Sequence, residues 1–413
     1  MWLSGLFFSA LALLLASGCG GGGGGQEEEQ AEEEQASEDA LESQDALNAA
    51  LEQSFSESGA PGVIAAVQTP EDTWVGTLGV ADLSSEEPML ADMHQRIGSV
   101  NKTFTVSLLL QAEADGLLSL DDTIDQYVEG VPNGDEITLR QMANMTSGIA
   151  SYTFNEQWQD ALFSDPRRIW RPEELVQYGI ADSPAFDPGT DFQYSNTNTV
   201  LLGMIIEQLT GQPLEQEFQD RIFVPLGMGN SLFPERSSAA IPDPHPRGYM
   251  YQTNVETLNT SELQEEEAEQ ADESAGEPND VTDENPSWGW AAGAAISTLN
   301  DMIIWAKADA TGALLSSEAQ KERLTWVSPP PSPGAQYGLA IAEFPGGFIG
   351  HDGQLPGFNS FVAHNPEAGA TIVVFTNVYS APDGSQPANE ITKAIVQELS
   401  GTGGEETSGE RTA

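Results

Sequence analysis

The chain has 413 residues, with 14 Lys or Arg, 65 Asp or Glu and a formal net charge of −51 at pH 7. This charge repels nucleic-acid phosphates and anionic lipid headgroups, so the composition argues against binding to either one through basic protein surface. The single cysteine, Cys19, excludes a disulfide within the chain. Because salt screens repulsion between acidic side chains, we expect salt to stabilise the folded state.

The chain begins with a candidate export signal. Residues 6–16, LFFSALALLLA, form an apolar run that is too short for a membrane span but suits a signal peptide. The following ASGC resembles the lipobox of bacterial lipoproteins, although Ala16 stands where Leu is usual and no Lys or Arg precedes the run. The resemblance implies a lipoprotein-type signal peptide over residues 1–18, lipidation of Cys19, and a membrane-anchored protein at the periplasmic or outer-membrane face of the cell envelope. The alternative is an ordinary cleaved signal peptide and a secreted protein.

The composition then changes along the chain. Residues 19–45 combine a glycine run with closely spaced Glu and Asp, which predicts a flexible, self-repelling tether. Residues 46–400 have the composition of a globular domain. Within it, residues 256–286 hold twelve acidic residues and no aromatic residue, which predicts a disordered acidic insertion. The tail at residues 401–413 is also predicted to be disordered.

The periodicity of the domain predicts strands at both ends and helices in the middle. Apolar runs at residues 62–69 and 73–82 read as a strand pair, and a helix is predicted from Lys102 to a stop at Gly116. A further helix is predicted to begin at a capping box over residues 138–141. Helices are also predicted at residues 199–211 and 297–312, both of which end in Gly, and at residues 388–399. Four strand-like segments occupy residues 336–344, 347–353, 358–365 and 370–377. Because strands from both ends must share one sheet, we expect an α+β fold, with an antiparallel sheet flanked by helices and a helical subdomain.

One spacing in the first predicted helix suggests nucleophilic catalysis. Ser99 and Lys102 form the only Ser-x-x-Lys sequence in the chain, which has four lysines. Residues three apart on a helix share a face, and a buried amine has a lowered pKa, so Lys102 could take the proton of the Ser99 hydroxyl. The start of a helix also offers free N–H groups to a developing oxyanion. Alone, the spacing is a weak signal.

Two further sequences, each unique in the chain, strengthen this signal. Tyr194 and Asn196 form the only Tyr-x-Asn, and His351 and Gly353 form the only His-x-Gly. Taken singly, each suits an ordinary structural role: Tyr194 as a core aromatic, Asn196 as the N-cap of the following helix, and His351 as a strand histidine.

The order Ser-x-x-Lys, Tyr-x-Asn, His-x-Gly resembles the class C β-lactamase and D-alanyl-D-alanine carboxypeptidase family of serine hydrolases, which is related to penicillin-binding proteins. RIGSVNKTFT, ITLRQMANMTSGI, FDPGTDFQYSNTN and GHDGQLPGFNSF also resemble segments of that family. The resemblance implies a β-lactamase/transpeptidase-like fold. It is greater to carboxypeptidase and esterase-like members, since the β-lactamases proper usually carry Lys-Thr-Gly in place of His-x-Gly.

The resemblance implies roles for three catalytic residues. Ser99 would be the acylated nucleophile, and Lys102 would orient and activate it. Tyr194 would be a hydrogen-bond partner, a candidate base and the proton donor to the leaving group. Whether the amine or the phenol is the base stays open.

The resemblance also implies substrate-binding residues. Asn196 would contact the substrate amide, and His351 would lie near a substrate carboxylate. Gly353 would let the substrate approach the strand, the N–H groups of Ser99 and Gln354 would form the oxyanion hole, and Trp288 would form a wall of the pocket.

Asp352 departs from the family pattern, in which this position is often Thr or another small residue. A carboxylate there would repel the anionic group of a β-lactam or of a D-Ala-D-Ala peptide, or pair with His351. We therefore expect a serine hydrolase that forms an acyl-serine intermediate with a small ester, amide or D-amino-acid peptide.

The alternatives are a β-lactamase and a catalytically silent envelope lipoprotein that uses the fold as a binding module. No His or Cys group has metal-ligand spacing, so we expect no metal and no cofactor. The sequence leaves the oligomeric state open.

Overall fold

A computed structural model describes residues 44–251, 276–327 and 336–401. The chain divides into two units, Met1–Ala46 and Leu47–Ala413, and the second contains the sheet. The predicted signal peptide, Cys19, most of the predicted tether and the tail beyond Gly401 lie outside the described residues. Among the residues that are described, no helix is both long enough and apolar enough to cross a membrane.

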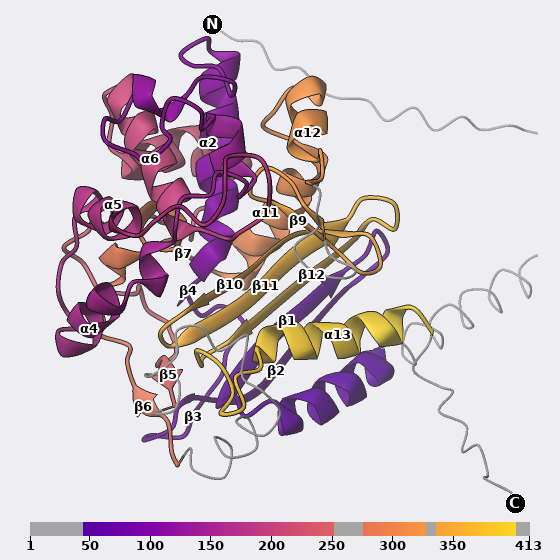
Figure 1. The fold of residues 1–413 in the computed structure, drawn as a ribbon. Coiled ribbons are helices and arrows are strands. Elements are labelled where there is room, and N and C mark those ends of the chain that lie inside the picture. The colour runs from indigo at the N-terminus through magenta and orange to yellow at the C-terminus, as the bar shows by residue number, and fades with distance from the viewer. Residues whose placement is uncertain (1–43, 252–275, 328–335, 402–413) are drawn as a thin grey trace, which may run out of the picture. The chain divides into compact units, whose positions relative to one another are not determined.

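In the described part of this unit, eight strands form one antiparallel sheet in the order β3-β2-β1-β12-β11-β10-β9-β8. The central strand β1 (Gly62–Gln68) pairs with β2 (Thr73–Asp82) on one side and with β12 (Ala370–Thr376) on the other. Strands from the two ends of the domain therefore meet, which confirms the predicted fold class (Figure 1). The remaining strands are β3 (Glu87–Pro88), β8 (Gln336–Tyr337), β9 (Ala342–Phe344), β10 (Phe348–Leu355) and β11 (Phe358–Asn365).

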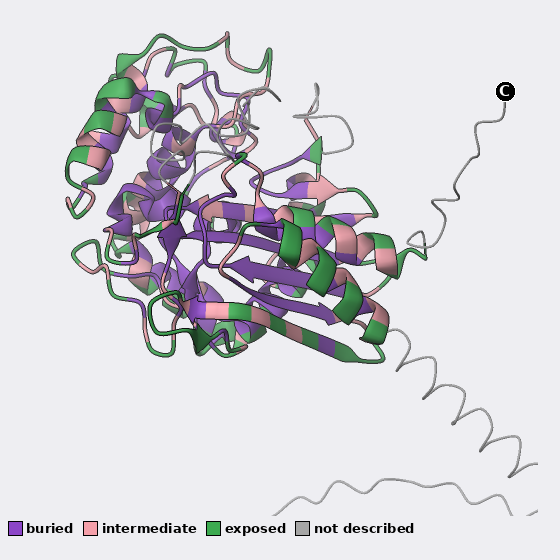
Figure 2. Cartoon of the chain, turned by 90° about the horizontal axis from the view of Figure 1, so that it is seen from below, coloured by how far each residue is buried: buried purple, intermediate pink, exposed green. Residues whose placement is uncertain are grey.

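Both faces of the central strands are covered, which explains why β1 and β12 consist mostly of buried apolar residues. On one face, Val63, Ala65 and Val67 pack in a cluster with residues of the helix at 44–57 and of α13 (Pro387–Leu399). Their neighbours Ile64 and Ala66 join the larger core on the opposite face. Figure 2 shows α13 exposed on its side away from the sheet, as an amphipathic covering helix requires.

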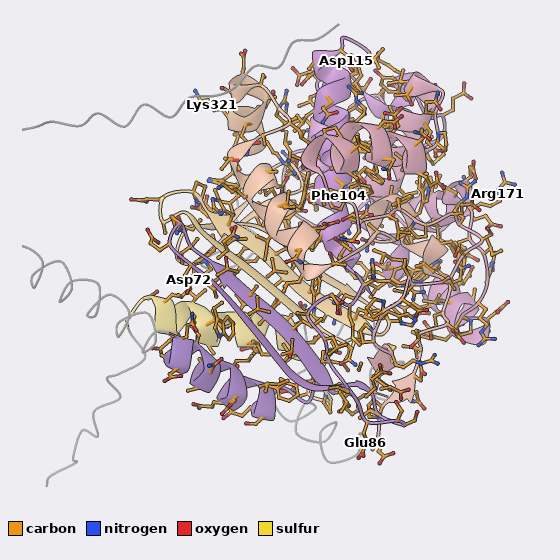
Figure 3. The ribbon with its side chains drawn as sticks, turned by 180° about the vertical axis from the view of Figure 1, so that it is seen from behind. Asp72, Glu86, Phe104, Asp115, Arg171 and Lys321 are labelled. Atoms are coloured by element: carbon orange, nitrogen blue, oxygen red, sulfur yellow. The ribbon has the colours of Figure 1, made fainter. Side chains whose placement is uncertain are left out.

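The larger core is built around α2 (Asn101–Ala114). Residues 101–110 of this helix are all buried, so the helix is covered on all sides along most of its length. Phe104 lies in the interior and packs at a tilt against Trp305 of α11 (Leu299–Thr311), with the ring centres 4.3 Å apart, whereas Asp115 lies at the exposed end of the helix (Figure 3). Other helices of this part are α3 (Leu139–Ala143), α4 (Glu156–Ser164), α5 (Pro172–Ala181), α6 (Asn196–Thr210), α7 (Leu214–Phe218), α8 (Val224–Leu226) and α12 (Ser317–Arg323). Short paired strands are β4 (Gln95–Arg96) with β7 (Ile296–Ser297), and β5 (Tyr249–Met250) with β6 (Asn279–Asp280).

Several local predictions are confirmed by the backbone. Thr138 and Gln141 form the predicted capping box at the start of α3. Gly211 and Gly312 end α6 and α11 in the left-handed conformation, with φ of 71° and 72°. The predicted strand at residues 336–344 is instead two short strands, because the chain turns between them and Gly338 N–H donates to the Ile341 carbonyl at 2.8 Å.

The predicted disordered insertion at residues 256–286 is wrong for its second part. Residues 276–286 are described, and two of them form β6, which pairs with β5. Thr282 is buried and accepts a hydrogen bond from Gly248 N–H at 2.8 Å, while the buried Asn285 side chain accepts from Ser287 N–H. Polar side chains order this acidic segment through backbone hydrogen bonds, which a search for apolar periodicity does not detect. Residues 256–275 lie outside the described residues.

Candidate active site

The predicted nucleophile is held on a turn that lies against the edge of the sheet. Ser99 belongs to a 3-10 turn, Gly98–Val100, that leads directly into α2. Strand β9 pairs with β10 only as far as Gly350, so the turn can approach the remaining edge of β10. A Cβ atom at Gly353 would lie 2.0 Å from the Ile97 carbonyl oxygen, and one at Gly98 would lie 2.5 Å from the Gln354 nitrogen. Glycine at both positions is therefore a steric requirement of this approach.

The Lys102 amine lies next to the Ser99 hydroxyl. Its Nζ atom is 2.8 Å from Ser99 Oγ and 2.8 Å from the Ala292 carbonyl oxygen. The side chain is fully buried, and no carboxylate forms an ion pair with it among the described residues. Burial lowers the pKa of Lys102 to about 7, and the more distant Asp352 carboxylate only partly opposes this effect. A large share of these amines is therefore neutral at neutral pH, so the amine can accept a proton.

Tyr194 lies on the other side of this amine, with Lys102 Nζ 4.8 Å from the centre of its ring. The Tyr194 hydroxyl is buried and has no hydrogen-bond partner of good geometry in the described part of the chain. It nevertheless lies close enough to Ser99 for the serine side chain to lower the pKa of Tyr194 slightly. Burial, reinforced by Tyr337, raises the pKa of Tyr194 well above its usual value. The phenol is therefore neutral at neutral pH.

A pocket of about 220 Å³ opens beside Ser99. Four of the predicted substrate-binding residues line it: Trp288, Asn196, Gly353 and Gln354. Asn196 is the first residue of α6 and its Nδ2 donates to Thr153 Oγ1 at 3.3 Å, whereas the N-cap position belongs to Ser195. The N-cap alternative for Asn196 is therefore wrong.

His351 does not line the pocket, which corrects its predicted placement near a substrate carboxylate. Its side chain is 3 % exposed, and both ring nitrogens have partners. Nδ1 lies 2.6 Å from the Asp352 carbonyl oxygen and donates to it, while Nε2 lies 3.1 Å from the Tyr337 hydroxyl. The ring therefore lies behind the pocket, where it packs 6.1 Å from the Tyr194 ring.

Asp352 lies in the pocket wall instead. Successive side chains of a strand point to opposite sides, and Asp352 follows His351 along β10. Burial alone would raise the pKa of Asp352, but His351 and the Asn389 amide outweigh this effect and hold it below its usual value. Asp352 is thus a permanent anion at neutral pH.

Sequence reasoning missed several residues of the pocket wall. Thr153, Phe154, Tyr379 and Gln386 also line it. Thr153 and Phe154 form a 3-10 turn before α4, and Tyr379 and Gln386 lie in the segment between β12 and α13. The position of Tyr379, just after a predicted strand, is the only signal that could have indicated it.

The site therefore combines a serine hydroxyl, a buried amine with a lowered pKa and a neutral phenol beside a pocket. This set suits the formation of a covalent acyl-serine by proton transfer from Ser99 to Lys102. Among the described residues, no group of three His, Cys, Asp or Glu side chains is arranged to hold a metal ion.

Comparisons with known proteins agree with this geometry. A protein-family model described as Beta-lactamase matches residues 47–396. The chain is 27 % identical over 201 residues to "Penicillin-binding protein 4*" of Bacillus subtilis, covering 48 % of this chain and 43 % of that protein. It is 31 % identical over 173 residues to a "D-aminopeptidase" of Brucella anthropi, covering 41 % of this chain and 32 % of that protein. The matches thus span less than half the length of these two relatives.

Solved structures cover more of the chain. A D-stereospecific amidohydrolase from Streptomyces sp. is 30 % identical, with a TM-score of 0.71, covering 87 % of this chain and 98 % of that one. The D-amino acid amidase from Ochrobactrum anthropi SV3, complexed with L-phenylalanine amide, is 25 % identical, with a TM-score of 0.73, covering 87 % of this chain and 99 % of that one. The similarity extends over nearly the whole of both solved chains.

Proposed function

Because the chain belongs to the beta-lactamase family of serine hydrolases, we propose that it hydrolyses a small amide or ester through an acyl intermediate on Ser99. The observation that carries this proposal is the 2.8 Å contact between Ser99 Oγ and Lys102 Nζ, an amine that burial holds near neutrality.

In the acylation step, Ser99 Oγ attacks the substrate carbonyl carbon while its proton passes to Lys102 Nζ. The carbonyl oxygen becomes an oxyanion, which the N–H groups of Ser99 and Gln354 would stabilise. When this intermediate collapses, the bond to the leaving nitrogen or oxygen breaks, and the leaving group takes the proton from Lys102 through the Tyr194 hydroxyl. The products are a free amine or alcohol and acyl-Ser99.

In the deacylation step, a water molecule attacks the acyl carbon and gives one proton to Lys102. The bond to Ser99 Oγ then breaks, and the proton returns to that oxygen. The products are a carboxylic acid and the original enzyme, so the net reaction consumes one water.

The two pKa shifts support Lys102 as the base and Tyr194 as the relay. Burial lowers the pKa of Lys102 to about 7, whereas the pKa of Tyr194 is raised well above its usual value. A neutral phenol between the amine and the leaving group can accept one proton as it donates another.

The pocket favours substrates without a carboxylate. Asp352 would repel the anionic group that β-lactams and D-Ala-D-Ala peptides carry, and His351 lies behind the wall rather than in it. The names of the D-aminopeptidase and D-amino acid amidase relatives support an amide of a D-amino acid. We therefore favour an amidase or esterase over a carboxypeptidase or a β-lactamase.

We further propose that the protein is exported and anchored by lipid at Cys19, with residues 19–45 as a tether to the domain. The ASGC sequence after the apolar run supports this proposal. Fractionation of cells that express Cys19→Ala should move the protein from the membrane to the soluble fraction, and an unchanged distribution would contradict lipidation.

Labelling of the nucleophile tests the proposed function. After treatment with a fluorophosphonate, mass spectrometry should find the adduct on Ser99, and Ser99→Ala should gain none. Ser56→Ala, at an exposed helical serine, is the matched control and should label like the wild type. Ser99→Ala should also lose about 10⁴-fold or more in kcat/KM for a nitrophenyl ester while keeping its melting temperature. A wild-type protein without an adduct would indicate a silent binding module.

A further inference from the structure

The wall of the active-site pocket carries a single ionised side chain among the described residues, and it is an anion. The lining consists of uncharged residues apart from Asp352. Lys102 and His351 are both buried, and neither lines the pocket. A substrate that enters this pocket therefore meets one carboxylate in the wall, and both of these basic side chains lie behind the wall.

The Asp352 carboxylate is held in place by a hydrogen bond from α13 and keeps part of its surface free. Asn389 of α13 donates from Nδ2 to Asp352 Oδ2 at 3.0 Å and to Gln386 Oε1 at 3.1 Å. The side chain keeps 31 % of its surface exposed, and its only ion-pair contact in the described residues is with the His351 ring. An anchored carboxylate with free surface in a concave site can accept charge-assisted hydrogen bonds from a ligand.

Aromatic side chains complete the surroundings of this carboxylate. Tyr379, Trp288 and Tyr194 line the same pocket, and Phe154 is 46 % exposed within its lining. Aromatic faces attract cations, so these residues and the carboxylate favour the same kind of ligand.

From this geometry we propose that Asp352 is a specificity-determining residue that binds a substrate ammonium group, so that the substrates are amides or esters of amino acids with a free amine. The inference rests on the proposed function and names the substrate class of that site. Asn389 is a positioning residue, because it acts through Asp352 without lining the pocket wall itself.

A purely structural role for Asp352 predicts different behaviour, and so does a general attraction of amines to the acidic surface. If Asp352 only joins β10 to α13, its loss should weaken all ligands equally. If the net charge of −51 attracts amines to the whole surface, the preference should vanish in salt and be insensitive to this one residue.

The test measures binding, so that it does not depend on turnover. In the Ser99→Ala protein, calorimetry compares D-phenylalanine amide with 3-phenylpropionamide, which differs by lacking the amine. We expect the amine to bind about tenfold or more tightly at about 0.5 M NaCl, and the preference to fall below about threefold after adding Asp352→Asn. Glu343→Gln, which removes a carboxylate of β9 outside the pocket lining, is the matched control and should keep the preference.

Three outcomes would overturn the proposal: no preference for the amine, a preference that survives Asp352→Asn, or an equal loss of both ligands. The fluorophosphonate adduct on Ser99 is a separate readout. An adduct without amine preference rejects the role of Asp352 and leaves the hydrolase standing, whereas amine preference without an adduct rejects the hydrolase alone.

Discussion

Two buried basic side chains, one in helix α2 and one packed against it, differ in the partners that surround them. In the first turn, Lys102 is 0 % exposed and contacts Ser99 and a carbonyl oxygen but, within the ranges that the structure describes, no carboxylate. Further along, the Arg323 guanidinium is 1 % exposed and lies 2.6 Å from the Asp309 carboxylate, and it donates to Ser107 Oγ at 2.9 Å and to the Thr103 carbonyl at 3.1 Å.

The difference shows two ways of accommodating a buried charge. Arg323 remains charged because it is paired, and it joins α12 to α2 and α11. Lys102 lacks such a partner, so burial lowers its pKa to about 7 and makes the neutral amine available. One arrangement serves the stability of the domain, and the other suits proton transfer.

The largest effect on activity is expected from substitution of Lys102. Lys102→Met should lower kcat/KM about 10²- to 10⁴-fold, because the base is lost. The melting temperature should stay the same or rise, since Met fills a buried site without a polar group. A nitrophenyl-ester assay and a thermal melt measure the two effects. Retained activity would show that Lys102 is not the base.

The opposite result is expected at Arg323. Arg323→Met should lower the free energy of unfolding by about 3–5 kcal/mol, because Asp309 is left buried without its partner. Urea titration measures this loss. The control is the double variant Arg323→Met with Asp309→Leu, which should recover most of it. A loss below about 1 kcal/mol in the single variant would contradict a role in stability.

The pH dependence of activity and of stability tests the lowered pKa of Lys102. Only the neutral amine can accept the Ser99 proton, so kcat/KM should fall about tenfold per pH unit below a pKa of about 7 and level off above it. The pKa of Lys102 is lower in the folded than in the unfolded chain, so between pH 7 and about pH 10 the unfolded chain binds more protons. The contribution of Lys102 to the free energy of unfolding therefore rises with pH over this window. Lys102→Met should remove both trends. If the dependence of kcat/KM on pH is unchanged in this variant, another group must cause the fall at low pH.

The smallest expected effect is that of salt. The melting temperature should rise by a few degrees between about 0.05 M and about 1 M NaCl, because salt screens the acidic surface. Both buried basic side chains are shielded from the solvent, so Lys102→Met and Arg323→Met should show the same rise as the wild type. A differential scanning measurement across this range checks it. An absence of any rise would contradict repulsion between surface charges.

Much of the fold could be predicted from local patterns. The strand pair at residues 62–69 and 73–82, the Gly-terminated helices and the closing helix follow from periodicity and caps, and the structure has them near the expected bounds. The pattern failed at residues 276–286, where the Asn285 and Thr282 side chains order the backbone through hydrogen bonds. It also gave no sign of the Arg323–Asp309 pair, whose partners belong to different helices.

The candidate site could also be predicted only in part from the sequence. The structure brings Ser99, Lys102 and Tyr194 together, and Asn196, Trp288, Gly353 and Gln354 line the pocket. Motif order placed His351 in the pocket, where the structure has Asp352. Adjacent residues of a strand point to opposite sides, so only the packing against Tyr337 and Asn389 decides which of the two meets a substrate.

By itself, the sequence determined the relations that depend on backbone geometry over a few residues. The spacing of Ser99 and Lys102 on one helical turn is such a relation, as are the positions where helices begin and end. The tertiary structure alone decided the depth of burial and the charge of each group. A pKa depends on the solvent and the charges that remote segments bring near. Residues far away in the chain bury the Lys102 amine and so lower its pKa, pair with the Arg323 guanidinium and hold the Asp352 carboxylate at the pocket surface.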